Sequence, residues 1–558
     1  MPRSAADRAT STDLDVVVIG AGFAGLYAVH RLRDRHGLAV RAFEAGSGVG
    51  GTWYWNRYPG ARCDIESVHY SYSFSEALQR DWQWSERFSA QPEILRYLEH
   101  VADRFDLRRD IQFDTRVTSI VWNDSAEHWT VGTDDGTSRT ARFVVSGAGN
   151  LSMAKKPEFP GIEEFGGEVY ATHLWPHEGV DLTGKRVGVI GTGATGIQLI
   201  PKVAERAAHL TVFQRTPNYA VPLRNRPTDP VEQEQVLASY PELRVAARNN
   251  FLGVPYDQPR PSAVADPEPE RQRVYDKYYG RGGFQMLIST YQDLLFDRAA
   301  NDTAAQYIRD RITERVQDPE LAAQLSPTDH AYGTKRPPME TDYYEAYNRD
   351  NVTLVDVRAA PIEAVTSTGL RTADGTEREL DVIVLATGFD AFTRALLNMG
   401  IVGRDGLTLE RKWADGPRTF LGIAVHGFPN LFTLTGPQSA VALYNNPLAI
   451  EDHVEFASDA IRHVLDSGLA TIEATEEAER DWGRTVAELA DATLMPQADS
   501  WYMGANIPGK PRSCMIYLGG APAYRACCDE VVAGGYRGFE LSPVTRSSSI
   551  PVAGSSTR

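Results

Sequence analysis

The sequence predicts an α/β fold made of two doubly wound units and a mainly helical insertion. Three observations lead to this prediction. A glycine-rich turn lies between an apolar strand and a helix near the N-terminus, and the same arrangement returns at residues 186–214. Between about residues 226 and 330, charged and apolar residues instead alternate at helical spacing. With 558 residues, the chain is long enough for two to four domains of about 150 residues each.

The first unit begins at residues 14–19, which are apolar and rich in β-branched side chains. Such a run is typical of a strand that is buried on both faces. A G-x-G-x-x-G turn, a helical pattern and a second strand at residues 39–43 follow, so we predict a βαβ unit. The glycines of this turn are Gly20, Gly22 and Gly25.

The second unit repeats this order, with strands predicted at residues 186–190 and 210–213. In both units the glycines permit a tight turn and a close approach of a pyrophosphate, and the helix N-terminus offers N–H groups to it. The turn and helix of the second unit supply the candidate nucleotide-binding residues Gly191, Thr192, Gly193, Gly196 and Gln198.

One position distinguishes the two nucleotide sites. Glu44 and Arg215 each lie 24 residues after the first glycine of their unit, Gly20 and Gly191, so they occupy the same structural position. A carboxylate there accepts hydrogen bonds from a ribose diol, whereas a guanidinium holds a 2′-phosphate. The first site therefore suits FAD and the second suits NADPH, with Thr216 as an additional hydroxyl donor. Two Rossmann-like dinucleotide-binding domains in one chain indicate a flavoprotein that takes hydride from NADPH.

The composition argues against several other classes of protein. Lys and Arg number 57 and Asp and Glu 74, and the resulting charge of −17 disfavours a nucleic-acid partner. No run approaches 18 apolar residues and the N-terminus lacks the apolar core of a signal peptide, so we expect no membrane association. The four cysteines form no C-x-x-C pair, which argues against a disulfide reductase and favours a cytoplasmic protein with free thiols.

The segment 50–64 has a highly specific pattern, Gly-Gly-Thr-Trp-Tyr-Trp-Asn-Arg-Tyr-Pro-Gly-Ala-Arg-Cys-Asp. It resembles the segment G-G-x-W-x(4)-[FY]-P-G-x(3)-D of Baeyer–Villiger monooxygenases, and the resemblance extends from about residue 13 to 541. It implies a single-chain enzyme that uses FAD, NADPH and O₂ to convert a small-molecule ketone into an ester or lactone through a flavin C4a-peroxide. Further matches to the family follow in order at residues 332–337, 386–390, 436–437 and 500–510.

The resemblance also implies roles for individual residues. Arg336 would stabilise the peroxide and the adduct formed on the ketone, and Asp64 would orient Arg336 beside the flavin. Lys335 would join Arg215 at the 2′-phosphate, and Trp501 corresponds to the family's indole beside NADP. The expected FAD contacts are Thr52, Trp53, Tyr54, Trp55, Asp64, Tyr70, Val117 and Asn446. The residues expected to face the substrate are Leu443 and Tyr444.

The chain departs from the family at the fingerprint F-x-G-x-x-x-H-x-x-x-W-[PD]. The matching residues are Phe165, Gly167, Trp175 and Pro176. The histidine position is Ala171, and His173 stands two residues later. Residues two apart share a face of a strand, so an extended segment would let His173 partly replace the missing side chain, displaced by roughly 6.6 Å. Two alternatives therefore stay open, namely a flavin monooxygenase that oxidises sulfides or amines, and an uncoupled NADPH oxidase.

These observations divide the chain into an FAD-binding domain, an NADP-binding domain and an insertion. Pro176 opposes a helix that would pair His173 with His177, so no metal is assigned. We expect a monomer or a weak homo-oligomer. The predicted divisions are 14–152 with 386–541 for FAD, 153–225 with 331–385 for NADP, 226–330 for the helical insertion, and disordered ends at 1–13 and 542–558.

Overall fold

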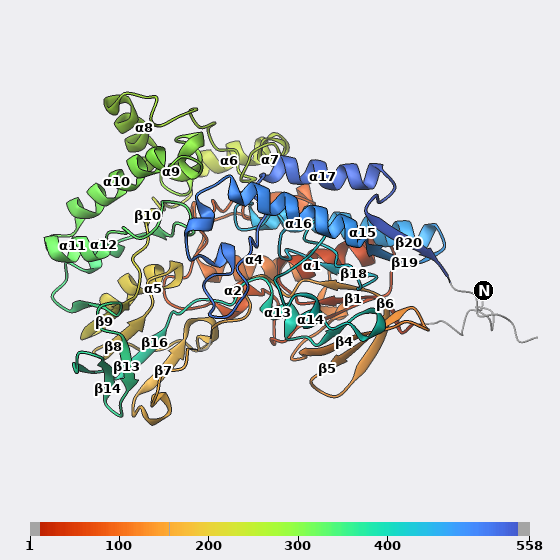
Figure 1. Cartoon of the computed structure of the whole chain (residues 1–558), viewed down its shortest axis with the longest axis horizontal. Helices are drawn as coiled ribbons and strands as arrows, with labels where there is room; N and C mark the ends of the chain where they lie inside the picture. The colour runs from red at the N-terminus through yellow and green to blue at the C-terminus, as the bar shows by residue number, and fades with distance from the viewer. Residues whose placement is uncertain (1–11, 156, 545–558) are drawn as a thin grey trace, which may run out of the picture.

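Two main β-sheets form the lower half of the molecule, with helices above them (Figure 1). The computed structural model describes residues 12–155 and 157–544. The larger sheet lies to the right in this view and the smaller, all-parallel sheet to the left. The predicted α/β fold with two dinucleotide-binding domains is therefore confirmed.

The larger sheet carries the first glycine-rich unit and has the order β17-β4-β5-β6-β1-β2-β3, with β18 also paired to β6. β1 lies parallel to both β6 and β2. Val16 and Val18 belong to one core cluster and Val17 to another, so both faces of this strand are covered, as its unbroken apolar run predicts. The strands are β1 Leu14–Ile19, β2 Val40–Phe43, β3 Ile111–Gln112, β4 Val117–Asn123, β5 His128–Thr133, β6 Ser138–Ser146, β17 Ile401–Val402 and β18 Leu431–Thr433.

The smaller sheet carries the second unit and has the order β12-β9-β8-β16-β7. The chain enters it after β6 of the larger sheet and leaves it after β16, so the larger sheet is built from two separate stretches of the chain. Its central strand β8 is buried apart from its first residue, as the sequence predicts. The strands are β7 Glu168–Ala171, β8 Arg186–Ile190, β9 His209–Gln214, β12 Val352–Asp356 and β16 Val382–Leu385.

A helix follows the glycine-rich turn of each unit. These helices are α1 Phe23–His30, which continues as a π-helix over Arg31–Arg35, and α5 Ala194–Ala204. α1 packs against the long helix α15 Asn446–Asp466, which lies with α16 Glu476–Asp491 and α17 Ala521–Ala533 across the upper part of the molecule (Figure 1). The first glycine-rich helix is therefore covered by a segment from the other end of the chain.

The predicted insertion is helical and forms the green upper left of Figure 1. Asp229, Asp297 and Asp318 cap three of its helices, because their carboxylates accept hydrogen bonds from backbone N–H groups of the first turn. Its helices are α6 Pro230–Ala238, α7 Tyr240–Arg248, α8 Glu268–Arg281, α9 Gln285–Ile288, α10 Arg298–Arg315 and α11 Pro319–Leu325.

Short elements complete the chain. Two of them form the pair β10 Val221–Pro222 with β11 Met339–Glu340, and three form a separate antiparallel sheet, β13 Ile362–Val365, β14 Gly369–Thr372 and β15 Glu377–Glu379. The short α-helices are α2 Thr52–Trp55, α3 Glu76–Asp81, α12 Tyr343–Ala346, α13 Arg394–Leu397 and α14 Leu409–Lys412, and α4 Gln91–Arg104 is longer. None of the helices in the described ranges is long and apolar enough to cross a membrane.

Order extends slightly beyond the predicted ends. The last strand, β20 Phe539–Pro543, pairs with β19 Leu469–Ala474 and passes residue 541. At the other end, the Asp13 carboxylate accepts a hydrogen bond from the backbone N–H of Thr140 at 2.8 Å. These pairings order residues 13, 542 and 543, contrary to the prediction. Residues 1–11 and 545–558, which make up most of the predicted disorder, lie outside the described residues.

Gly25 provides a test of the first glycine-rich turn. A Cβ at this position would lie 1.8 Å from the carbonyl oxygen of Gly20, so Gly25→Ala must displace backbone. We expect a loss of stability of about 3 kcal/mol, the upper end of the usual cost of overpacking, seen as a lower thermal midpoint and loss of bound FAD. Gly280→Ala, in α8, is the matched control, because a Cβ there meets nothing within 4 Å. Its helix should gain roughly 0.5–1 kcal/mol, and equal behaviour of the two variants would contradict the argument.

Candidate active site

A largely buried ion pair joins two predicted residues that lie far apart in sequence. The Nη2 of Arg336 is 2.7 Å from Oδ1 of Asp64. The other terminal nitrogen, Nη1, donates to the carbonyl of Ala442 at 3.1 Å, and the guanidinium lies 4.7 Å from the ring centre of Phe284. Burial alone would lower the pKa of Arg336, but the neighbouring groups, chiefly Asp64, together outweigh that effect and raise it. A permanent, oriented positive charge is the result.

Tyr502 lies near this pair, and the sequence analysis did not single it out. Its side chain is fully buried, and its hydroxyl lies close enough to Arg336 to interact with the guanidinium. Burial raises the pKa of Tyr502 to about 12, against the opposing effect of Arg336. The hydroxyl is therefore a protonated donor that fits a polar group arriving beside Arg336. The only signal in the sequence was its place directly after Trp501 in the 500–510 motif.

The first glycine-rich turn fits a dinucleotide. Glu44 is 5% exposed, and its carboxylate accepts hydrogen bonds from the backbone N–H groups of Ala21 at 2.7 Å and Gly46 at 2.8 Å. Burial raises the pKa of Glu44, although these hydrogen bonds oppose the rise. The carboxylate is thus fixed between the turn and the end of β2, where a ribose would lie. Gly22 is the N-cap of α1 and leaves its N–H groups uncovered by any side-chain cap.

The second turn is open where a pyrophosphate would bind. A Cβ at Gly193, the N-cap of α5, would meet nothing within 4 Å, whereas one at Gly196 would lie 2.2 Å from the carbonyl oxygen of Gly191. The open surroundings of Gly193 leave space in front of the helix. The short distance at Gly196 shows why the helix needs glycine there to approach the turn. The hydroxyl of Thr192 donates to the carbonyl of Thr216 at 3.1 Å, which ties the turn to the end of β9.

Several cations gather at the end of β9. Arg215 is exposed, and its charge helps burial to lower the pKa of Lys335. Arg358, which the sequence analysis missed, donates to the Thr216 hydroxyl at 3.0 Å and to the carboxylate of Asp329 at 2.8 Å. Two like charges placed close together are unfavourable unless an anion binds between them, so this arrangement fits the 2′-phosphate of NADP. Arg358 had no motif to mark it, because β12 brings it to this point.

The predicted FAD contacts fall into a buried aromatic group, the sheet and the start of a helix. The indole of Trp53 donates to the hydroxyl of Tyr70 at 3.2 Å, and Val117 is buried in β4. Asn446 is the first residue of α15, and its side-chain oxygen has no partner in the part of the chain described, which fits a polar ligand. Thr52, Trp53, Tyr54 and Trp55 together form the short helix α2.

The two predicted substrate residues are buried rather than open to solvent. Leu443 and Tyr444 are 4% and 3% exposed. The hydroxyl of Tyr444 donates to the carboxylate of Asp452 at 2.5 Å, which directs this end of the side chain into the protein. Trp501 stacks on Phe392 with ring centres 5.5 Å apart. The roles predicted for these three side chains remain predictions.

Comparison with known proteins identifies the family. A family model described as flavin-binding monooxygenase-like matches residues 14–228. An acetone monooxygenase (methyl acetate-forming) from Gordonia sp. (strain TY-5) is 45% identical, with 96% of this chain and 100% of the relative covered. A Baeyer–Villiger monooxygenase from Pseudooceanicola batsensis is 44% identical, with 95% and 96% covered. A solved structure of an oxidised steroid monooxygenase bound to NADP is 51% identical, with a TM-score of 0.90 and coverage of 95% and 99%.

The chain belongs to the Baeyer–Villiger monooxygenases. The expectation of an FAD- and NADPH-dependent flavin monooxygenase is thereby confirmed at the level of the family. Heteroatom oxidation and uncoupled NADPH oxidation, the two alternatives from the sequence, are not favoured by these relatives.

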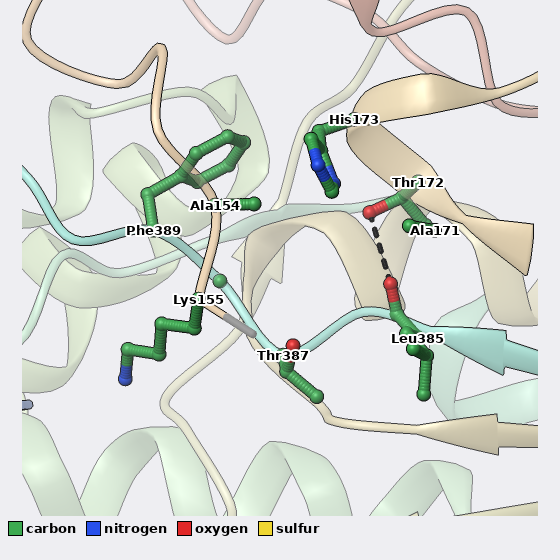
Figure 2. A pocket seen from close by; sticks show the side chains of 9 residues that line it. Ala154, Lys155, Ala171, Thr172, His173, Leu385, Thr387 and Phe389 are labelled. Atoms are coloured by element: carbon green, nitrogen blue, oxygen red, sulfur yellow. Dashed lines mark hydrogen bonds between the residues drawn. The ribbon is translucent and has the colours of Figure 1, made fainter. Parts of the chain in front are cut away.

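The fingerprint segment of this Baeyer–Villiger monooxygenase is not extended as far as His173. β7 ends at Ala171, and Thr172–Leu174 form a 3₁₀ turn, in which the hydroxyl of Thr172 donates to the carbonyl of Leu385 at 3.3 Å. Strand alternation therefore cannot place His173. Even so, Ala171 and His173 line the same pocket, together with Lys155 and Phe389 (Figure 2). This pocket lies where the chain crosses between the two sheets.

Arg215 provides a test of the second nucleotide site. We expect Arg215→Ala to weaken NADPH binding roughly tenfold or more, because a charged hydrogen bond is lost, and to change NADH binding less than about twofold. Dissociation constants from fluorescence titration measure both. Arg206→Ala, another exposed arginine of the same unit, should leave both unchanged. An equal loss of NADPH and NADH affinity in Arg215→Ala would contradict the assignment of the 2′-phosphate.

Proposed function

We propose that this chain oxidises a small-molecule ketone to an ester or lactone, with NADPH as reductant and O₂ as oxidant. The observation that carries the proposal is the ion pair between Arg336 and Asp64 beside the buried hydroxyl of Tyr502. The relatives support it, since one of them is named for forming methyl acetate and acts as an acetone monooxygenase. FAD, when bound and reduced by NADPH, supplies the activation of O₂.

In this proposal, Arg336 provides a fixed positive charge to oxygen atoms that become negative during the reaction. Its guanidinium stays protonated at any working pH, and its surroundings exclude most water, which strengthens the electrostatic effect. Asp64 and the carbonyl of Ala442 hold two of its nitrogens, so its orientation does not depend on the substrate. Phe284 covers its face. Asp64 is thus a positioning residue for Arg336.

The proposed NADP site consists of Arg215, Thr216 and Lys335, with Arg358 as an addition from the structure. The effect of Arg215 on the pKa of Lys335 and the contact from Arg358 to Thr216 support this grouping. We further propose that the protein works in the cytoplasm as a monomer or weak homo-oligomer. Its four cysteines, which are all free, support a reducing compartment.

The reaction itself can be tested with a panel of cyclic, linear and aryl ketones. NADPH consumption and the mass of the product are measured together, and we expect a product heavier than the ketone by one oxygen atom. Bound flavin is checked by its absorption. If the flavin is present and no ketone of the panel gives an ester or lactone, the proposed function is wrong.

Arg336→Ala should retain FAD and still oxidise NADPH, but lose ester formation by roughly 100-fold or more, as expected when a preorganised charge is removed. The ratio of ester formed to NADPH consumed measures this effect. Arg273→Ala, which replaces an exposed arginine of α8, is the control and should behave as the unmodified protein. Ester formation at an unchanged rate in Arg336→Ala would remove Arg336 from the proposed role.

We also propose that His173 acts in place of the missing fingerprint histidine, because it lines the same pocket as Ala171. His173→Ala should lower the ester formed per NADPH consumed, and adding Ala171→His to that variant should restore part of the loss. Leu174→Ala changes the next residue, which is 59% exposed, and should have no effect. An unchanged ratio in His173→Ala would show that the pocket functions without an imidazole.

A further inference from the structure

One contact between the two nucleotide-binding units is formed by a turn and an amide side chain. Gln198 lies on α5, directly after the second glycine-rich turn, and residues 58–62 belong to the flavin side of the molecule. The Gln198 side-chain oxygen accepts hydrogen bonds from the hydroxyl of Tyr58 at 2.8 Å and from the N–H of Arg62 at 3.4 Å. Its side-chain nitrogen donates to the carbonyl of Arg62 at 3.1 Å.

The turn also lies directly against the backbone of α5. Gly60 has a φ of +87°, and a Cβ there would lie 2.3 Å from the carbonyl oxygen of Gln198. Tyr58 is buried, and that burial raises its pKa to about 12. Its hydroxyl therefore keeps its proton and remains a donor to Gln198 throughout the neutral range. The hydrogen bonds of Gln198 and the close packing at Gly60 together join the turn to the helix.

The same turn leads directly to the ion pair. Asp64 follows Arg62 by two residues, and the segment between them is held on its other side by the bond from the N–H of Cys63 to the carbonyl of Ser89 at 3.0 Å. The guanidinium of Arg62 donates to the carbonyl of Phe88 at 3.1 Å. Because only Cys63 separates Arg62 from Asp64, we expect a displacement of the turn relative to α5 to be transmitted to Asp64.

We infer that Gln198 is a positioning residue which aligns Asp64, and through it Arg336, with the NADP-binding helix. Both polar atoms of the Gln198 side chain bond to the turn, so its amide is not available to the nucleotide in this arrangement. NADP bound at the N-terminus of α5 would thus tighten the segment 58–64. This inference rests on the proposed function for the role of Arg336, but the contact itself does not.

Hydrogen–deuterium exchange of the flavin-loaded protein, with and without NADP⁺, tests the inference without any ketone turnover. In the unmodified protein, NADP⁺ should slow exchange in peptides that cover residues 58–64 by at least about threefold. In Gln198→Ala, the same peptides should exchange faster, and NADP⁺ should no longer protect them. The NADP⁺ dissociation constant should change less than about threefold, and ester formed per NADPH should fall while the KM for NADPH stays constant.

Two further variants sharpen the result. Tyr58→Phe removes one of the three hydrogen bonds and should give a smaller effect, and its combination with Gln198→Ala should be no worse than Gln198→Ala alone. Glu205→Gln, at the exposed end of α5, should match the unmodified protein.

Persistent NADP⁺ protection of residues 58–64 in Gln198→Ala would overturn the inference. So would a tenfold loss of NADP⁺ affinity with unchanged exchange, which would make Gln198 a nucleotide ligand. Absence of ester in the unmodified protein would instead overturn only the proposed function.

Discussion

The pairing of Arg336 with Asp64 is the constraint on which the rest of the site depends. Removing a guanidinium and a carboxylate from water is costly, and the cost is offset only when both groups are paired and hydrogen bonded. Here Arg336 also bonds to the carbonyl of Ala442 and lies over Phe284. Three segments of the chain must therefore come together around one side chain. The proposed electrostatic role needs this arrangement, because a mobile arginine in water would stabilise a developing negative charge far less.

An acidic protein can bind two dinucleotides because local geometry dominates over net charge. The net charge of −17 is spread over the surface, where water and salt screen it. At the second nucleotide site, by contrast, Arg215, Lys335 and Arg358 meet within one small region. At the first site the proposed contact is instead the buried carboxylate of Glu44, which suits a ribose rather than a phosphate. The charge therefore says something about macromolecular partners and nothing about the cofactors.

Sequence reasoning succeeded where a short segment determines its own structure. The glycine-rich turns, the strands beside them and the equivalent positions of Glu44 and Arg215 follow from patterns within about 30 residues. It left the conformation at His173 open, because β7 pairs with the distant strand β16 only as far as Ala171, and a 3₁₀ turn follows. Tyr502 and Arg358 were missed for a similar reason. Their surroundings come from other parts of the chain, and no local pattern marks a tyrosine or an arginine as special.

The sequence by itself determined the two nucleotide-binding units, the choice between FAD and NADPH, and the family, since each depends on residues close together in the chain. The tertiary structure alone decided how these units contact each other. Arg336 and Asp64 are separated by 272 positions, and Tyr58 and Gln198 by 140, so their contacts exist only after the domains have packed. Hydrogen bonds and ion pairs act over about 3 Å. Which side chains come within that distance is a property of the folded chain, where loops of over a hundred residues have been closed.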